Sequence, residues 1–366
     1  MEKPYPPIYY ADYLALEEIL SAQHPKSEAY GRPAHDEMLF IVVHQAYELW
    51  FKQILHELTS VIELLGRDYV DESDVGIAVA RLGRIVAIQK LIVGQLDVLE
   101  TMTPLDFLDF RDFLLPASGF QSVQFRLIEN RLGLEPQMRT NFHSGSYAAT
   151  LKPEDRRRLE AAEREPSLFE TLERWLERTP FLDLEGFNFM ERYRQAVSRM
   201  LEADRRTIEQ HPHLSEEERI TQLSEFARTE ENFAALFDEG KHEELVKQGR
   251  RRLSYRATLA ALFIHLYRDQ PILHLPFRLL TTVIDIDEQL TTWRYRHALM
   301  VHRMIGTKIG TGGSSGHHYL KETAEKHKIF TDLLDLSTFL IPRSSLPELP
   351  ADVRRKLGFF FTGEGR

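Results

Sequence analysis

The stretch "FIVVHQAYELWFKQILHELTSVIELL" (residues 40–65) decides the fold. Its apolar residues recur three or four positions apart, which places them on one face of an α-helix. These residues are Val43, Tyr47, Trp50, Ile54, Leu58, Val61 and Leu65. The sequence therefore predicts a long amphipathic helix whose apolar face packs into a helical core.

Helical periodicity extends outward over most of the chain. Residues 82–99 repeat the pattern, and "SGFQSVQFRLIENRLG" (residues 118–133) opens with the capping box Ser118-x-x-Gln121 and closes on Gly133. Further helices are predicted at about 167–178, 186–210, 215–238, 241–249, 253–268, 276–305 and 317–335. Because no convincing alternating strand run occurs, we expect an all-α fold built as a single large helical domain.

Two stretches depart from this pattern. Residues 137–165 are polar and read as a loop or insertion within the helical domain. The proline-rich "LIPRSSLPELPADV" (residues 340–353) reads as a tail that wraps around the domain.

Composition excludes several classes of function. The 366 residues carry a formal net charge of -10, which argues against a nucleic-acid or anionic-membrane partner held by bulk electrostatics. Without a long apolar run or a signal-peptide pattern, the sequence predicts a cytoplasmic protein. The absence of cysteine means that any metal here is held by histidine or carboxylate.

Two histidines stand out on predicted helices. In "HDEMLFIVVHQAYELW" (residues 35–50), Phe40 and His44 share a helix face, although a histidine among aromatics is more often a core residue than a catalyst. In "TTWRYRHALMVHRMIG" (residues 291–306), His297 lies in an apolar run that suits a proximal haem ligand. Met300 and Met304 are as easily explained as core filler. A zinc hydrolase is a poor reading, because His297 and His302 are five apart and no H-E-x-x-H occurs.

Two further stretches have both a functional and an ordinary reading. In "DFLDFRDFLLPASGFQS" (residues 106–122), Arg111 is either a surface ion-pair partner or a guanidinium fork for a substrate carboxylate. The loop "GTGGSSGHHYLKET" (residues 310–323) follows a predicted helix and lacks the P-loop motif, so it is not a nucleotide loop. It is either a flexible connection or a lid that closes over a polar ligand.

Together these blocks resemble, in order, the signature blocks of the tryptophan 2,3-dioxygenase family. The similar segments are "HDEMLFIVVHQAYELWFKQILHEL", "FRDFLLPASGFQSVQFRLIENRLG", "WRYRHALMVHRMIG" and "GTGGSSGHHYLKET", and the resemblance runs from about Tyr9 to "STFLIPR" at 337–343. It implies an all-α homotetramer with one haem b per subunit. The implied reaction uses O2 to open the indole ring of L-tryptophan to N-formyl-L-kynurenine, the first step of tryptophan catabolism by the kynurenine pathway.

The resemblance also implies roles for individual residues. His297 would be the axial ligand of the haem iron, His44 would lie beside the indole N–H, and Arg111 would pair with the substrate carboxylate. Indole would be walled by Phe40, Phe107, Phe110 and Leu14, while the loop residues Gly310 and Thr311 would hold the amino-acid end under a substrate-ordered lid. Ser118 and Gly119 would lie near a haem propionate and the substrate, and Tyr10 and Tyr13 would reach a neighbouring subunit's site.

In this reading residues 1–30 serve a neighbouring active site and residues 31–366 form the haem-binding catalytic domain. Phe107 replaces a tyrosine of some bacterial relatives, which removes one hydrogen bond to the carboxylate. A helical insertion at about 186–250, absent from shorter bacterial members, resembles the longer, animal-like branch.

The alternatives are a peroxide-driven hydroxylase, a broader indoleamine-type dioxygenase, a haem sensor without catalysis and a purely structural helical protein.

Overall fold

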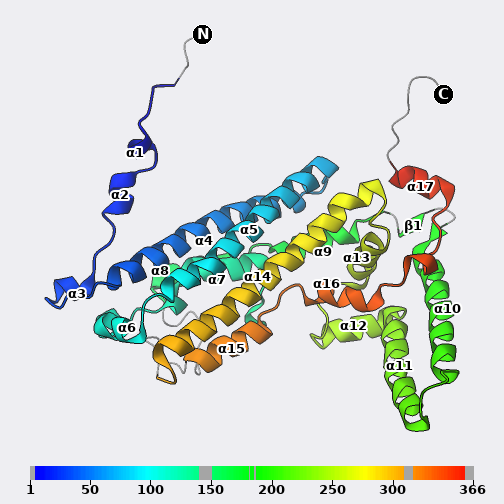
Figure 1. Cartoon of the computed structure of the whole chain (residues 1–366). Helices are drawn as coiled ribbons and strands as arrows, with labels where there is room; N and C mark the ends of the chain where they lie inside the picture. Colours follow the sequence, from blue (N-terminus) through cyan, green and yellow to red (C-terminus); the bar gives the residue numbers. More distant parts are fainter. Residues whose placement is uncertain (1–4, 140–150, 181, 185–186, 309–315, 359–366) are drawn as a thin grey trace.

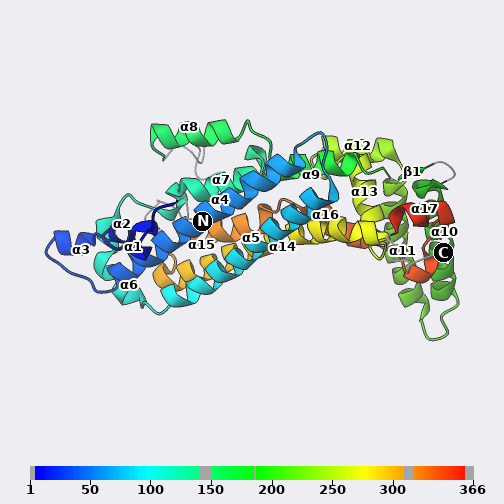
Figure 2. The same cartoon turned by 90° about the horizontal axis from the view of Figure 1, so that it is seen from above.

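Three long helices lying side by side form the body of the protein in the computed structural model, which describes residues 5–139, 151–180, 182–184, 187–308 and 316–358. They are α4 (Glu37–Leu65), α5 (Glu72–Leu99) and α14 (His274–Ile305) (Figures 1 and 2). Helix α5 packs against both of the others, with side chains such as Leu58, Leu82 and Ile286 fully buried between them. The amphipathic pattern of residues 40–65 therefore forms one wall of a helical core, as predicted.

Shorter helices complete the bundle. Helix α7 (Val123–Leu132) packs on α4, α15 (Gly316–Lys326) on α14, and α6 (Pro104–Arg111) closes one end. The other helices are α8 (Pro153–Ala162), α9 (Leu168–Glu177), α10 (Phe189–Glu209), α11 (Glu216–Leu236), α12 (Glu239–Lys247), α13 (Tyr255–Leu266), α16 (Thr331–Asp335) and α17 (Ala351–Leu357). In the described residues the strands are β1 (Asp183–Leu184) and β2 (Phe187–Asn188), paired antiparallel. The all-α prediction is confirmed.

The predicted start of the third helix was wrong by a few residues. The Ser118–Gln121 capping box exists, but it caps the N-terminal end of a 3-10 turn, η2 (Gly119–Gln121), and not of the helix. Helix α7 begins at Val123, because Ser122 turns extended and its hydroxyl accepts from the Phe125 N–H at 3.2 Å. The closing residue, Gly133, was predicted correctly and has a φ of 107°.

The predicted helix at 317–335 is two helices in the structure. Between α15 and α16, the backbone N–H groups of Ile329 and Phe330 donate to the Asp287 carboxylate on α14, at 2.9 and 3.0 Å. Because these N–H groups donate to Asp287 and not to carbonyl groups within a helix, the helix is interrupted and the chain changes direction. This is a tertiary effect, which the local periodicity of the sequence does not contain. The polar stretch at 137–165 includes α8, and the proline-rich tail leads into α17.

Both ends of the bundle carry extensions. The N-terminal segment holds α1 (Tyr10–Tyr13), α2 (Leu16–Leu20) and α3 (Lys26–Ala29) and runs away from the body (Figure 1). At the opposite end, α10 and α11 pack as a hairpin within the predicted 186–250 insertion. No helix in the described part of the chain is both long and apolar enough to cross a membrane.

Candidate active site

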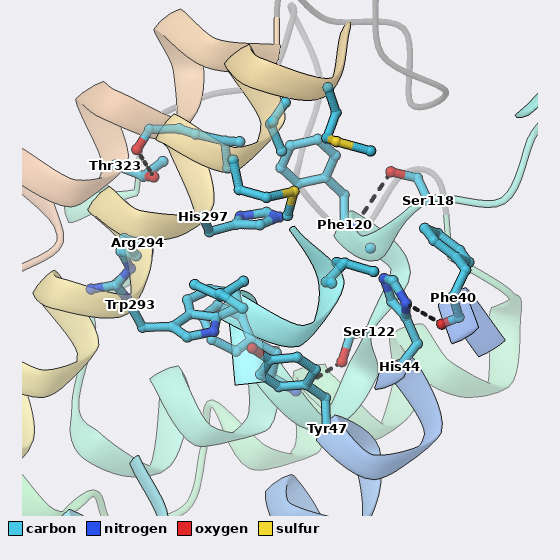
Figure 3. A pocket seen from close by; sticks show the side chains of 18 of the residues that line it. Phe40, His44, Tyr47, Ser118, Phe120, Ser122, Trp293, Arg294, His297 and Thr323 are labelled. Carbon is cyan, nitrogen blue, oxygen red and sulfur yellow. Dashed lines mark hydrogen bonds between the residues drawn. The ribbon is translucent and has the colours of Figure 1, made fainter. Parts of the chain in front are cut away.

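A cavity of about 260 Å³ lies inside the bundle, between α4, α6, η2, α7, α14 and α15. Figure 3 shows its side chains converging from these elements. Aromatic and aliphatic residues form most of the lining, among them Phe40, Tyr47, Phe51, Phe107, Phe125, Trp293, Met300 and Met304. The long helices therefore enclose an apolar space of the kind that takes a flat organic ligand.

His297 stands on α14 and lines this cavity (Figure 3). Its ring is stacked on Trp293 with centroids 5.0 Å apart and planes at 15°. Its Nδ1 is buried and has no hydrogen-bond partner in the described part of the chain. Burial lowers the pKa of His297 to about 4, with nearby His44 adding to the effect. At neutral pH the ring is therefore an uncharged nitrogen donor, the form that binds iron.

His44 reaches the cavity from α4. Its Nδ1 lies 2.7 Å from the Phe40 carbonyl oxygen, and because a carbonyl only accepts, Nδ1 carries the proton and donates. The other nitrogen, Nε2, is left as an acceptor. Burial lowers the pKa of His44, while the Phe40 carbonyl and the Glu48 carboxylate act in the opposite direction. The ring is thus a neutral hydrogen-bond acceptor.

Three phenylalanines pack behind His44. The Phe40 ring lies 4.1 Å from the His44 ring, 5.8 Å from Phe107 and 5.5 Å from Phe110. Phe40 and Phe107 line the cavity, whereas Phe110 is 0% exposed and supports them from behind. The three predicted wall phenylalanines therefore pack together, and Phe40 and Phe107 line the cavity; that they wall an indole stays a prediction.

Polar groups also line the cavity. Arg111 at the end of α6 lines it together with Ser118 and Gly119. The loop that carries Ser118 and Gly119 is fixed to α4, because the Glu48 carboxylate accepts from the Ser122 hydroxyl at 2.6 Å and from the Gln124 amide at 2.8 Å. Three predicted site residues, from the end of α6 and from the start of η2, therefore line the same cavity.

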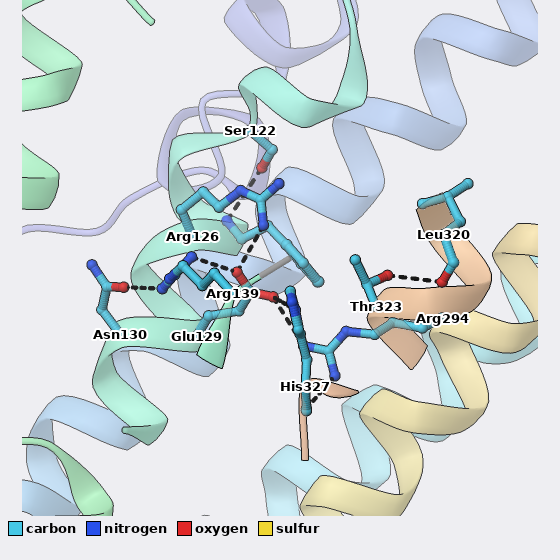
Figure 4. A network of polar contacts seen from close by, with 10 residues as sticks. Ser122, Arg126, Glu129, Asn130, Arg139, Arg294, Leu320, Thr323 and His327 are labelled. Atoms are coloured by element: carbon cyan, nitrogen blue, oxygen red, sulfur yellow. Dashed lines mark hydrogen bonds and ion pairs between the residues drawn. The ribbon is translucent and has the colours of Figure 1, made fainter. Parts of the chain in front are cut away.

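A buried ionic network, which the sequence did not reveal, occupies another part of the wall (Figure 4). At its centre is the Glu129 carboxylate, which accepts from the guanidinium groups of Arg126, Arg139 and Arg294 at 2.9 to 3.0 Å. Burial alone would raise the pKa of Glu129, but the three arginines and His327 hold it well below its usual range. Arg126, Glu129, Arg294 and His327 all line the cavity.

Other predicted residues lie elsewhere. Tyr10, Tyr13 and Leu14 belong to the extended N-terminal segment and do not line the cavity of their own subunit. Gly310 and Thr311, with the proposed lid, lie outside the described residues. Trp293 was missed, although its position four residues before His297 could have indicated that the two rings share a helix face. Met300 and Met304 are both core residues and cavity lining.

The fold and this pocket define a class of protein. It is a helical bundle that encloses a largely apolar cavity, whose lining includes two neutral imidazoles and a guanidinium. A single unprotonated imidazole nitrogen suits haem iron, and no cluster of three or more metal-ligating side chains competes with it in the described residues.

Comparisons with known proteins narrow that class. A sequence profile of the tryptophan 2,3-dioxygenase family matches residues 5–340. The chain is 54% identical to a tryptophan 2,3-dioxygenase of Bdellovibrio bacteriovorus and 51% identical to one of Alteromonas mediterranea, covering 98% of this chain and 99% of each relative. It is 46% identical to the enzyme of Mus musculus, over 98% of this chain and 87% of that relative. The chain belongs to the tryptophan 2,3-dioxygenase family.

Proposed function

We propose that the pocket binds haem b and inserts both atoms of O2 across the indole C2–C3 bond of L-tryptophan, giving N-formyl-L-kynurenine. The family makes the chain a tryptophan dioxygenase, with tryptophan and O2 as its substrates. The observation that carries the proposal for this pocket is that His297 and His44 both line one apolar cavity, each in its neutral form.

His297 is the residue that would hold the haem. Its Nδ1 is buried against the protein, so the nitrogen available to the cavity is Nε2. When bound through one imidazole, ferrous haem supplies an open coordination position for O2. The ring plane is fixed by the stack on Trp293, which restricts the direction in which the nitrogen points. We assign one haem per subunit, as the resemblance implies, with His297 as its ligand.

His44 would orient the substrate rather than act as an obligatory base. Its Nε2 is an acceptor, and the indole N–H is a donor without an acceptor function. A hydrogen bond between them would hold the indole beside Phe40 and Phe107, which line the same cavity. Holding reacting groups at a fixed geometry lowers the entropic part of the barrier, which is the contribution these residues make.

Arg111 would bind the substrate carboxylate. Its planar guanidinium suits a carboxylate, and it lines the same cavity as Ser118 and Gly119. Phe107 has no hydroxyl, so the carboxylate would depend on Arg111 and, as the resemblance implies, on Thr311. This division of the ligand between an aromatic wall and a cationic end selects an aromatic amino acid.

Assembly forms part of the proposal. We assign residues 1–30 to a neighbouring subunit's site in a homotetramer, supported by exposed fractions of 75% for Tyr10 and 72% for Tyr13. Exposed aromatic side chains of this kind commonly mark an interface. The cytoplasmic location expected from the sequence stays a prediction, which fractionation of cells would test.

The product of one turnover tests the function. We expect the haem-loaded, reduced protein to convert L-tryptophan in isotopically heavy O2 to a product that carries two heavy oxygen atoms and absorbs in the near ultraviolet. A product with one added oxygen, formed only with peroxide, would assign the pocket to a hydroxylase. Haem binding with no product under either condition would identify a sensor.

A further inference from the structure

A second cavity, of about 170 Å³, lies apart from the active site. Its lining comes from α11, α12, the turn after α12, the end of α16 and η5 (Leu336–Phe339) (Figure 1). It shares no lining residue with the active-site cavity. Most of its lining belongs to the insertion predicted at about 186–250, to which the proposed function gives no role.

Two arginines in the turn after α12, Arg250 and Arg251, line this cavity. Gly249 begins the turn with a φ of 67°, and its N–H donates to the Val246 carbonyl at 2.9 Å. The backbone N–H groups of both arginines donate to the Leu245 carbonyl, at 2.9 and 3.2 Å. Because the end of the helix fixes their backbone, the arginines lose only side-chain freedom when they bind a ligand.

Neither guanidinium is paired with a carboxylate in the described part of the chain. Arg251 lies over the Phe339 ring, 5.6 Å from its centroid, and its Nη1 is buried without a hydrogen-bond partner among the described residues. The exposed Arg250 side chain also forms no hydrogen bond or ion pair with them. Asp335 lines the cavity but forms no ion pair with either arginine. Two guanidinium groups and one carboxylate leave the lining with an excess of positive charge, which favours an anion.

The rest of the lining is partly apolar. Leu236, Leu245 and Phe339 contribute hydrocarbon surface, and Asn232 and His242 contribute an amide and an imidazole that can form hydrogen bonds. An inorganic anion would leave the apolar side chains uncovered. A carboxylate attached to an apolar group would pair with the arginines and bury the apolar surface as well.

We propose that this second cavity binds a small organic acid. Arg250 and Arg251 hold its carboxylate, for which the planar guanidinium is well shaped, and the apolar part of the acid lies against Leu236, Leu245 and Phe339. The site does not depend on haem or on tryptophan, so the proposal stands apart from the proposed function. It makes the insertion a ligand-binding element.

A comparison of three ligands tests the proposal without any mutation. Benzoate is the probe, benzamide is its uncharged analogue, and inorganic phosphate is an anion without an apolar part. Each is titrated calorimetrically into the full-length protein, and we expect benzoate to bind at least tenfold more tightly than the other two. Absence of benzoate binding, or equal affinity for benzamide, would overturn the proposal. Phosphate that binds as tightly as benzoate would overturn the choice of an organic acid.

Matched variants locate the bound acid. Arg250→Gln and Arg251→Gln should each weaken benzoate binding at least fivefold. Arg228→Gln is the control, because it removes an arginine of α11 that does not line the cavity, and it should leave the affinity unchanged. Since Arg250 is exposed, its replacement removes no buried side chain and keeps the test valid if Arg251→Gln fails to fold. Loss of binding in Arg111→Gln, with no change in the two cavity variants, would place benzoate in the active site and overturn the proposal.

Discussion

His44 and His297 show how the surroundings give one residue type two different roles. Both rings are neutral because burial lowers their pKa values. They differ at Nδ1: in His44 it donates to the Phe40 carbonyl, and in His297 it is buried without a partner in the described residues. The hydrogen bond fixes the tautomer of His44. The His297 ring has no such bond, so its other nitrogen is the one that an external ligand would stabilise most.

The pH dependence of apo-protein stability follows from His297. Its pKa is about 4 in the folded protein and ~6.5 in the unfolded chain, so the unfolded state binds more protons between these values. Stability is therefore full above pH ~6.5 and is lost as pH falls toward 4, by up to ~3 kcal/mol. Urea unfolding at several pH values measures the slope. His297→Leu should flatten it in this range, and an unchanged slope would show that other groups carry the effect.

A second prediction concerns the hydrogen bond from the indole N–H to His44. His44→Ser should keep haem and tryptophan binding and lower kcat/KM roughly tenfold to hundredfold, the effect of one lost orienting hydrogen bond. In the wild type, 1-methyltryptophan, which lacks the N–H, should be a poorer substrate by a similar factor.

The matched comparison is the selectivity between the two substrates. If His44 acts through the N–H, His44→Ser loses most of the preference for tryptophan over 1-methyltryptophan. Complete loss of turnover in His44→Ser, with tryptophan still bound, would refute the orienting role and make His44 an obligatory base.

Residue types with a chemical signature could be predicted from the sequence, and the ionic network could not. His44, His297, Arg111, Phe40 and Phe107 were all expected at the site, and the structure brings them to one cavity. Whether each performs its assigned role stays a prediction. The partners of Glu129 come from α7, α14 and two chain segments far apart in sequence. Arg126 is related to Glu129 by the helical spacing i,i+3, but no local spacing relates Arg139, Arg294 and His327 to it, because only the packed fold brings these residues together.

At the scale of elements, the periodicity of the apolar residues predicts where helices occur and how many there are, whereas the residues at which the helices begin and end depend on tertiary contacts. Helices α9 to α14 start and finish within a few residues of the prediction. The break between α15 and α16 was missed, since it depends on Asp287 capturing two backbone N–H groups from another helix. The start of α7 was predicted too early for a different reason. Ser118 caps η2 and Ser122 caps α7, and the sequence does not show which of the two serines begins the helix.

Gly133 gives a prediction at the junction of α7 and α9. A Cβ atom there would lie 2.6 Å from the Phe169 Cβ, and its φ of 107° is unfavourable for any side chain. Gly133→Ala should therefore destabilise the protein by roughly 2–4 kcal/mol, the sum of backbone strain and overpacking. Gly249→Ala is the control, because its φ is 67° but a Cβ there meets nothing within 4 Å. Denaturant midpoints compare them, and equal losses would show that the close contact relaxes freely.

At the scale of the whole molecule, the bundle encloses the cavity but leaves the N-terminal segment outside it. Helices α1 and α2 extend from the body, and Tyr5, Ile8, Tyr9, Tyr10 and Tyr13 are all more than half exposed. A group of large exposed apolar and aromatic side chains in one short segment is costly in water unless another surface covers it. Within the proposed homotetramer, the neighbouring subunit would provide that surface.

Complementation between two inactive proteins tests this arrangement. Subunits lacking residues 1–15 keep His297, and His297→Ala subunits keep the segment; each alone should be inactive or nearly so. If the segment serves a neighbouring site, co-refolding the two should restore activity, because a truncated subunit then receives the segment of its partner. Random pairing of two subunit types in equal amounts predicts roughly a quarter of the wild-type activity. Mixing two differently tagged His297→Ala proteins is the control and stays inactive. The tags show whether mixed oligomers form. If they form and remain inactive, the segment lies over its own subunit's pocket, because a partner's segment then cannot replace the one that the truncated subunit lacks.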